Sequence, residues 1–155
     1  MSDFFSYQGP APAAPRPAAD AAPQAILAEL SSEEWALFIG FAARRRYPPG
    51  AVLVTAGDSD RALCFIASGE VELLGPGKTV AHRRDGEVFG LLSFLDGAPS
   101  AVTARVGRAA AAELLRLTPD ALLQLSAWQP RIALALMRDL GALVASRLRL
   151  LQPAD

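Results

Sequence analysis

The sequence is poor in the residue types that build covalent, metal and redox sites. Its 155 residues include one cysteine, Cys64, and one histidine, His82. A single cysteine excludes an internal disulfide and a cysteine-rich zinc site, and a single histidine argues against centres that need several imidazoles. A nucleophilic cysteine would also need a partner base, for which the sequence offers no second histidine. We therefore expect no metal, no catalytic residue and no enzymatic activity.

The chain also lacks a basic excess and a long apolar run. Its net charge is -1 at pH 7, whereas a protein that binds nucleic acid over its whole surface usually carries an excess of Lys and Arg. No charge-free apolar run approaches the roughly 18–20 residues of a membrane helix. The first residues have neither the basic region nor the apolar stretch of a signal peptide. We expect a cytoplasmic protein that binds neither DNA nor a membrane.

Alanine and proline dominate the first part of the chain. Residues 9–24 contain five prolines, which disfavour helices and sheet ladders and favour extended backbone. We therefore divide the chain into a disordered Ala/Pro-rich tail, residues 1–24, and one domain, residues 25–155. The tail begins with an aromatic tip that is a candidate docking motif for a protein partner, and the alternative is a tail that packs loosely on its own domain or on nothing. The tip consists of Phe4, Phe5 and Tyr7.

A helix is predicted at the start of the domain. Ser31 and Glu34 have the spacing of a capping box. Trp35 and Phe38 then recur at helical spacing and give the helix one apolar face. We place the arginines at 44–46 in its last turn, where cations suit the negative end of a helix.

Short apolar runs separated by glycine turns follow this helix. They predict strands at 51–55, 63–67, 70–74, 79–83, 101–106 and 112–117, and then two helices, at about 118–128 and 131–151. Strands at this spacing indicate a β-sandwich or roll rather than alternating β-α units. The sequence from Gly75 to Thr79 lacks the first glycine and the following helix of a phosphate-binding loop, so it is predicted to be a hairpin turn. The predicted core consists of Trp35, Phe38, Val52, Val54, Phe65, Ile66, Val71, Leu73, Phe89, Leu92, Leu95, Leu115, Leu117 and the leucines of the last two helices.

The segment from Phe89 to Ala104 carries the strongest functional signal. Gly90 opens one predicted helical turn, and Pro99 lies in the loop that leads into the next strand. A helix start after glycine presents backbone N–H groups and is a potential anion site. With the turn at 47–50 and the strand pair at 65–71, this segment resembles the cyclic nucleotide-binding domain family. The resemblance covers about residues 30–151. It implies a mainly β fold: an eight-stranded β-roll with an N-terminal helix, a short cassette helix and two C-terminal helices.

The cassette differs from the family pattern at two positions. The family places Glu directly after Phe-Gly, to bind the ribose 2′-hydroxyl, and Arg after the Pro, to pair with the cyclic phosphate. This sequence has Leu91 and Ser100 there. Losing an arginine–phosphate contact in a desolvated pocket costs on the order of 2–5 kcal/mol. We therefore expect no cofactor and disfavour a cyclic nucleotide, unless Arg105 or Arg83 compensates. The candidate ligand-pocket residues are Phe89, Gly90, Leu91, Leu92, Ser93, Pro99, Ser100 and Ala101.

The last helix is the remaining candidate surface. Its apolar residues recur at alternating three- and four-residue steps from Ala133 onward. In the activator proteins of the family this helix forms the dimer interface, and packing against the roll is the alternative. We assign its distal half to a protein partner or a homodimer, with Leu143, Val144, Arg147, Leu150 and Leu151 as the candidate contacts.

The sequence thus predicts a non-enzymatic regulatory module of the cyclic nucleotide-binding type. Transcription factors of the family carry a DNA-reading domain after the last helix, whereas only residues 152–155 follow here. We expect the module to stand alone, to act in trans through protein–protein interaction, and to have lost the usual cyclic nucleotide contacts. The alternative is a genuine small-molecule sensor that binds cyclic AMP, cyclic GMP or another ligand in the pocket of the roll.

Overall fold

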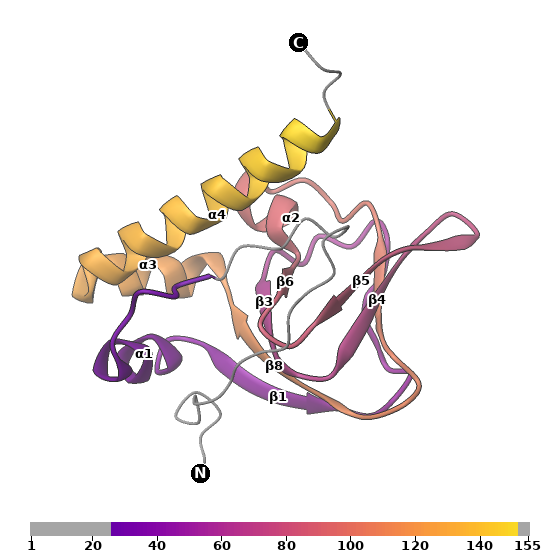
Figure 1. Ribbon diagram of the computed structural model, residues 1–155, viewed down its shortest axis with the longest axis horizontal. Helices are drawn as coiled ribbons and strands as arrows, with labels where there is room; N and C mark the ends of the chain where they lie inside the picture. The colour runs from indigo at the N-terminus through magenta and orange to yellow at the C-terminus, as the bar shows by residue number, and fades with distance from the viewer. Residues whose placement is uncertain (1–25, 152–155) are drawn as a thin grey trace.

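A computed structural model describes residues 26–151, in which two antiparallel four-stranded sheets are flanked by helices (Figure 1). One sheet has the strand order β1-β8-β3-β6 and the other the order β2-β7-β4-β5. These elements confirm the predicted roll with its N-terminal, cassette and C-terminal helices. The elements are α1 (Ser32–Ile39), β1 (Ala43–Tyr47), β2 (Val52–Val54), β3 (Leu63–Ser68), β4 (Glu70–Gly75), β5 (Lys78–Arg84), β6 (Val88–Phe89), α2 (Leu91–Asp96), β7 (Thr103–Val106), β8 (Ala112–Leu117), α3 (Pro119–Trp128) and α4 (Pro130–Leu151).

The central strands β3 and β8 are buried on both faces. Alternate residues of a strand point to opposite sides of a sheet. In β3, Leu63 and Phe65 pack among the helices, whereas Cys64 and Ile66 pack in the second core between the two sheets. The four residues are at most 6% exposed. This double burial explains why β3 reads as a continuous apolar run.

The helix α1 begins as predicted, but the arginines that follow it lie in a strand. The side chain of Ser31 accepts a hydrogen bond from the amide of Glu34, and the carboxylate of Glu34 accepts one from the amide of Ser31, which confirms the capping box. The helix ends at Ile39, and the arginines at 44–46 pair with β8 as part of β1. Placing them in the last helical turn was wrong. An exposed edge strand such as β1 needs few apolar residues, so its sequence gave no alternation to detect.

The predicted core is wrong at several positions. Leu92 is 63% exposed, Val52 58% and Leu95 37%. In the cassette helix α2 the buried apolar residues are instead Leu91, 3% exposed, and Phe94, 4% exposed. Because α2 is six residues long, periodicity could not tell which of its leucines face inward.

The chain enters the fold against the middle of α4. Leu27 is 1% exposed, and its amide donates a hydrogen bond of 2.7 Å to Asp139 on α4. Its φ of 59° is in the left-handed region, which is uncommon for a residue other than glycine. The predicted tail, residues 1–24, lies outside the described residues, and so does its aromatic tip.

The helix α4 has one buried and one exposed apolar face. The buried face is the one with the predicted three- and four-residue steps, and it packs against the helical side of the roll as far as Leu143. The other face repeats at the same alternating steps and consists of Leu134, Met137, Gly141, Val144, Leu148 and Leu151. Four of these side chains are well exposed: Leu134 by 62%, Met137 by 37%, Leu148 by 54% and Leu151 by 82%.

Candidate functional site

The cassette is built on a glycine that cannot be replaced without strain. Gly90 has a φ of 80°, and a Cβ atom added to it would lie 2.6 Å from the carbonyl oxygen of Ala62. The helix α2 starts at the next residue and ends at Gly97, whose φ is 76°. These two left-handed residues hold the short helix against β3.

A small pocket opens beside this cassette, between the two sheets. Its cavity volume is about 30 Å³. A water molecule needs roughly 10–15 Å³ by the same measure, so the space suits a few waters. Four predicted pocket residues line it, namely Phe89, Gly90, Ser93 and Ser100, and its other lining residues are Tyr47, Leu53, Val54, Asp60, Ala62, Cys64, Leu114 and Arg116.

An ion pair supplies the charge of the pocket. The guanidinium of Arg116 on β8 lies 2.7 Å from the carboxylate of Asp60, with the two side chains 27% and 40% exposed. Burial alone would lower the pKa of Arg116, but Asp60 and Cys64 outweigh it and the pKa is raised. The positive charge in the pocket is therefore already balanced.

Cys64 contributes a thiol to the wall of the pocket. Burial raises the pKa of its thiol from 9.0 to about 12, although Arg116 beside it favours the thiolate. The thiol is therefore protonated at neutral pH and behaves as a small apolar side chain.

The side chains at the two altered cassette positions, Leu91 and Ser100, make their contacts within the protein. Leu91 does not line the pocket, and its side chain is buried in the helical core. The hydroxyl of Ser100 donates to the carbonyl oxygen of Val102 at 2.6 Å and accepts from the amide of Val102 at 3.3 Å. The backbone of Ser100 is engaged as well, because it pairs with Gly57 and Asp58. The side chain of Ser100 is thus bonded within its own loop, and its backbone is bonded to the loop between β2 and β3.

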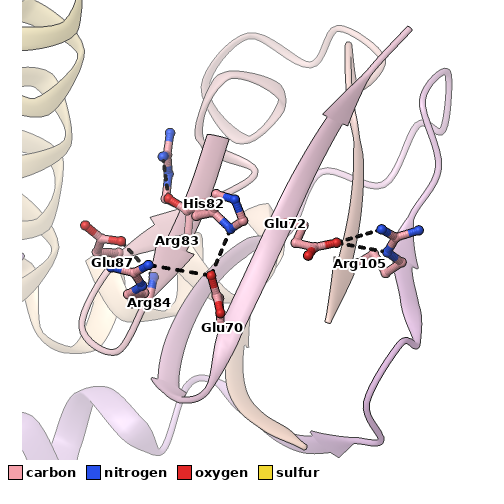
Figure 2. Close-up of polar contacts among 7 residues, drawn as sticks. All are labelled: Glu70, Glu72, His82, Arg83, Arg84, Glu87 and Arg105. Atoms are coloured by element: carbon pink, nitrogen blue, oxygen red, sulfur yellow. Dashed lines mark hydrogen bonds and ion pairs between the residues drawn. The ribbon is translucent and has the colours of Figure 1, made fainter. Parts of the chain in front are cut away.

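The two arginines considered as substitutes are also placed elsewhere. Arg105 makes two hydrogen bonds, of 2.7 and 3.2 Å, to the carboxylate of Glu72 on the neighbouring strand β4 (Figure 2). This pair lies on the outer side of its sheet, because the alternate residues Ala104 and Val106 fill the core between the sheets. Arg83 on β5 does not line the pocket either.

The sequence did not predict three other polar residues that line the pocket. Tyr47, Asp60 and Arg116 are drawn to it from three segments far apart in the chain. One signal was available: Arg116 has the same parity in its strand as the buried Ala112 and Leu114, so a charge was to be expected on the inner face. Conversely, Leu92, Pro99 and Ala101 do not line the pocket.

The predicted partner contacts on α4 differ in how far the structure exposes them. Leu143 is 5% exposed and packs in the core of its own domain, so it is unavailable to a partner and its assignment was wrong. Val144 is half-buried, and Leu151 lies on the exposed face at 82%. Leu150 is 68% exposed, and Arg147 is half-buried.

The described part of the chain contains neither a cluster of metal ligands nor a membrane-spanning helix. Within residues 26–151, no group of three metal-ligating side chains comes together. In the same residues no helix is long and apolar enough to cross a membrane.

Fold and cassette together define the class. Residues 44–127 match the model of the cyclic nucleotide-binding domain family, which is more than half of the chain, so the protein belongs to this family. Among curated proteins it is 37% identical over 126 residues to the cyclic AMP receptor protein of Thermus thermophilus, which covers 77% of this chain and 55% of that protein. It is 32% identical over 126 residues to a Bradyrhizobium diazoefficiens protein named glutaminase 2, covering 81% of this chain and 20% of that protein.

Solved structures give the same result. The catabolite activator protein of Thermus thermophilus has a TM-score of 0.71 at 33% identity, over 81% of this chain and 59% of that one. A cyclic nucleotide-binding domain from Methylobacillus flagellatus has a TM-score of 0.69 at 26% identity, over 77% of this chain and 69% of that one. The chain spans about half the length of the Thermus protein and a fifth of the Bradyrhizobium protein.

Proposed function

We propose that this chain is a non-enzymatic regulatory domain that acts through protein contact and has lost the usual contacts to a cyclic nucleotide. One observation carries the proposal: at the two positions where the family binds sugar and phosphate, Leu91 is part of the core and Ser100 is bonded to its own loop. The absence of catalysis is supported by Cys64, the one thiol in the chain, which burial keeps protonated.

Electrostatics supports the loss of phosphate binding. A cation whose charge is not already neutralised strengthens the binding of a cyclic phosphate. In the pocket Arg116 is paired with Asp60 at 2.7 Å, and on the outer face Arg105 is paired with Glu72 at 2.7 Å. Recruiting either arginine would break an existing ion pair and leave a carboxylate beside the ligand.

The test is calorimetric titration of the full chain with cyclic AMP and cyclic GMP. The name of the Thermus relative makes cyclic AMP the first ligand to try. We expect no saturable heat at micromolar concentrations. Saturable micromolar binding by the wild-type chain would refute the proposal and establish the small-molecule sensor instead.

A gain-of-function variant tests the same reasoning from the other side. Ser100→Arg supplies the missing guanidinium at the cost of the hydroxyl's two bonds to Val102. We expect tighter binding of cyclic AMP than in the wild type, by about tenfold or more, because a charge-assisted contact is gained. Ser100→Lys is the matched control, since it adds charge without the fork geometry and should gain less. Failure of both variants to gain affinity would show that a phosphate does not lie at position 100.

For the protein contact we propose a homodimer through the exposed face of α4. Leu134, Met137, Val144, Leu148 and Leu151 recur there at coiled-coil spacing. The seam covers fewer than three heptads, which is short for an isolated coiled coil, but α4 is already held in place by its buried face. The same helix makes the dimer interface in the activator proteins that this chain resembles.

Sedimentation equilibrium of the full chain measures this contact. We expect a dimer in the wild type and a monomer in Leu148→Glu, because a charge placed in an apolar seam is desolvated without a partner. Leu123→Glu is the control, since Leu123 is 65% exposed on α3 and lies off the seam. A wild-type monomer, or a dimer that survives Leu148→Glu, would exclude this interface. Contacts through Phe4, Phe5 and Tyr7 stay a prediction.

A further inference from the structure

The strand β1 leaves one edge of its sheet open. It stands at the end of the strand order β1-β8-β3-β6, and within residues 26–151 it pairs with β8 alone. Figure 1 shows β1 along the lower border of the roll. Alternate residues of an edge strand direct their backbone N–H and C=O groups away from the paired strand, which makes the edge a template for a further strand.

The side chains of β1 are exposed and cationic. Its first four residues are exposed, and Tyr47 is half-buried. The guanidinium of Arg44 lies 3.4 Å from the carboxylate of Glu113 on β8. None of the ion pairs within residues 26–151 includes Arg45 or Arg46. The strand therefore carries two consecutive cations without a carboxylate partner in the described domain, although the net charge of the whole chain is -1.

These two arginines point to opposite faces of the sheet, because consecutive strand residues alternate between faces. Arg46 is in register with Glu113 of β8, and Arg45 is in register with Leu114, which packs in the core between the sheets. A strand added beside β1 would place one side chain next to each arginine. Such cross-strand pairs are favourable for opposite charges and unfavourable for like charges. A second copy of β1 would bring arginine against arginine, so the edge disfavours self-pairing and favours an acidic strand.

We propose that β1 binds an extended acidic segment of a partner protein, which adds to the sheet as a further strand. Backbone hydrogen bonds to the open edge supply affinity, and carboxylates beside Arg45 and Arg46 supply selectivity through charge-assisted hydrogen bonds. Because the two arginines are consecutive, the segment needs two consecutive acidic residues within an extended stretch.

The charge distribution of the chain favours a peptide over a nucleic acid. A nucleic acid has no backbone that can continue a sheet, and proteins that bind it usually present a broad basic surface and a basic excess. The net charge of -1 shows no such excess. Neither Arg45 nor Arg46 lines the pocket beside the cassette, and both lie on a strand and not on α4. The proposal is therefore independent of the loss of nucleotide contacts and of the homodimer.

The experiment is fluorescence anisotropy of a labelled peptide, acetyl-Thr-Val-Glu-Glu-Val-Thr-amide, titrated with the full chain. We expect saturable binding, weakened about tenfold or more in the double variant Arg45→Gln/Arg46→Gln, because two charge-assisted contacts are lost. Arg138→Gln/Arg149→Gln is the matched control, since both arginines are exposed on α4 and the net charge changes by the same amount. Circular dichroism should show that both double variants melt at the wild-type temperature, as exposed substitutions usually do.

Two altered peptides separate strand addition from plain charge attraction. A peptide with Gln in place of both Glu residues keeps the backbone and loses the charge. A peptide with N-methyl groups on the two Glu amides keeps the charge and loses one backbone donor on each of its edges. We expect each altered peptide to bind about tenfold more weakly or worse.

Four results would overturn the proposal. They are no saturable binding of the unmodified peptide, equal affinity in the wild type and Arg45→Gln/Arg46→Gln, an equal loss in the α4 control, and full affinity of the N-methylated peptide. Tighter binding of a short oligothymidylate, lost with the same two arginines, would assign the edge to nucleic acid and refute strand addition as well. We expect Leu148→Glu to bind the peptide as the wild type does, so failure of the homodimer leaves this test intact.

Discussion

Leu91 is the position where the structure makes the sharpest prediction about the cassette. Restoring the family's acid there, by Leu91→Glu, should damage the fold instead of creating a sugar contact. Leu91 is 3% exposed and packs among the helices with Phe94 and Phe65. Removing a buried leucine costs about 2 kcal/mol of hydrophobic stabilisation, and a buried carboxyl without a partner adds at least ~1–3 kcal/mol.

The expected loss is therefore about 3–5 kcal/mol, a large share of the roughly 5–15 kcal/mol that stabilises a domain. For a domain of this size each kcal/mol lowers the melting temperature by roughly 3–5 °C, so we expect a drop of about 10–20 °C. Circular dichroism melting of the two proteins measures it. Leu92→Glu is the matched control, because Leu92 is 63% exposed on the same helix, and it should change stability by no more than about 0.5 kcal/mol.

The pH dependence of the damage has a definite sign. A carboxyl at position 91 has its folded pKa raised by burial above the unfolded value of about 4.3. The unfolded chain then loses the proton first, so the penalty grows as the pH rises above about 4 and shrinks on acidification. Equal effects of Leu91→Glu and Leu92→Glu, or a penalty that does not grow with pH, would refute the placement of Leu91 in the core.

Three further predictions concern the pocket. Gly90→Ala should lower the free energy of unfolding, measured in urea, by at least about 2 kcal/mol, because of its positive φ and the carbonyl oxygen 2.6 Å from the new Cβ. Gly57→Ala is the control: its φ is also positive but the space around it is open, so it should lose only about 1 kcal/mol. Similar losses in the two variants would contradict the close approach at Gly90. The Cys64 thiol in the folded protein should resist alkylation at pH 8. Because its pKa rises from 9.0 to about 12 on folding, the free energy of unfolding should fall as the pH rises through that range. Cys64→Ala should remove this contribution to the pH dependence of stability. Asp60→Ala leaves Arg116 unpaired and should cost about 1 kcal/mol, since both side chains are partly exposed; no loss in the melting temperature would show that solvent already screens the pair.

The sequence was a good guide to the fold where local chemistry acts alone. The capping box at Ser31, the hairpin turn after Gly75 and the strands around Phe65 and Val71 follow from patterns a few residues long. The edge strand β1 was not predicted because its exposed arginines show no alternation of apolar and polar residues. Its position is set by pairing with β8, which is far away in the chain.

The sequence predicted only part of the candidate site, because the rest of the site also depends on contacts between distant segments. Gly90 and Ser100 were found from the cassette pattern, and both line the pocket. The direction of Leu91 depends on how α2 is rotated against the helical core, and the Asp60–Arg116 ion pair depends on strands that meet only in three dimensions. Neither can be derived from spacing. The face of α4 that packs inward was likewise one of two with the same periodicity, and only the packing decided between them.

The double burial of β3 has a mechanical consequence. Cys64 forms part of the pocket wall, while the residues on either side of it, Leu63 and Phe65, are packed against the helices. Phe65 contacts Phe38 of α1 ring to ring, with centroids 5.3 Å apart. A close-packed interior has little compressible space, so a displacement of the pocket wall must be taken up by its neighbours. The pocket and the helical layer are therefore separated only by the backbone of β3. A displacement of this strand on the pocket side must also displace the side chains that pack against the helices.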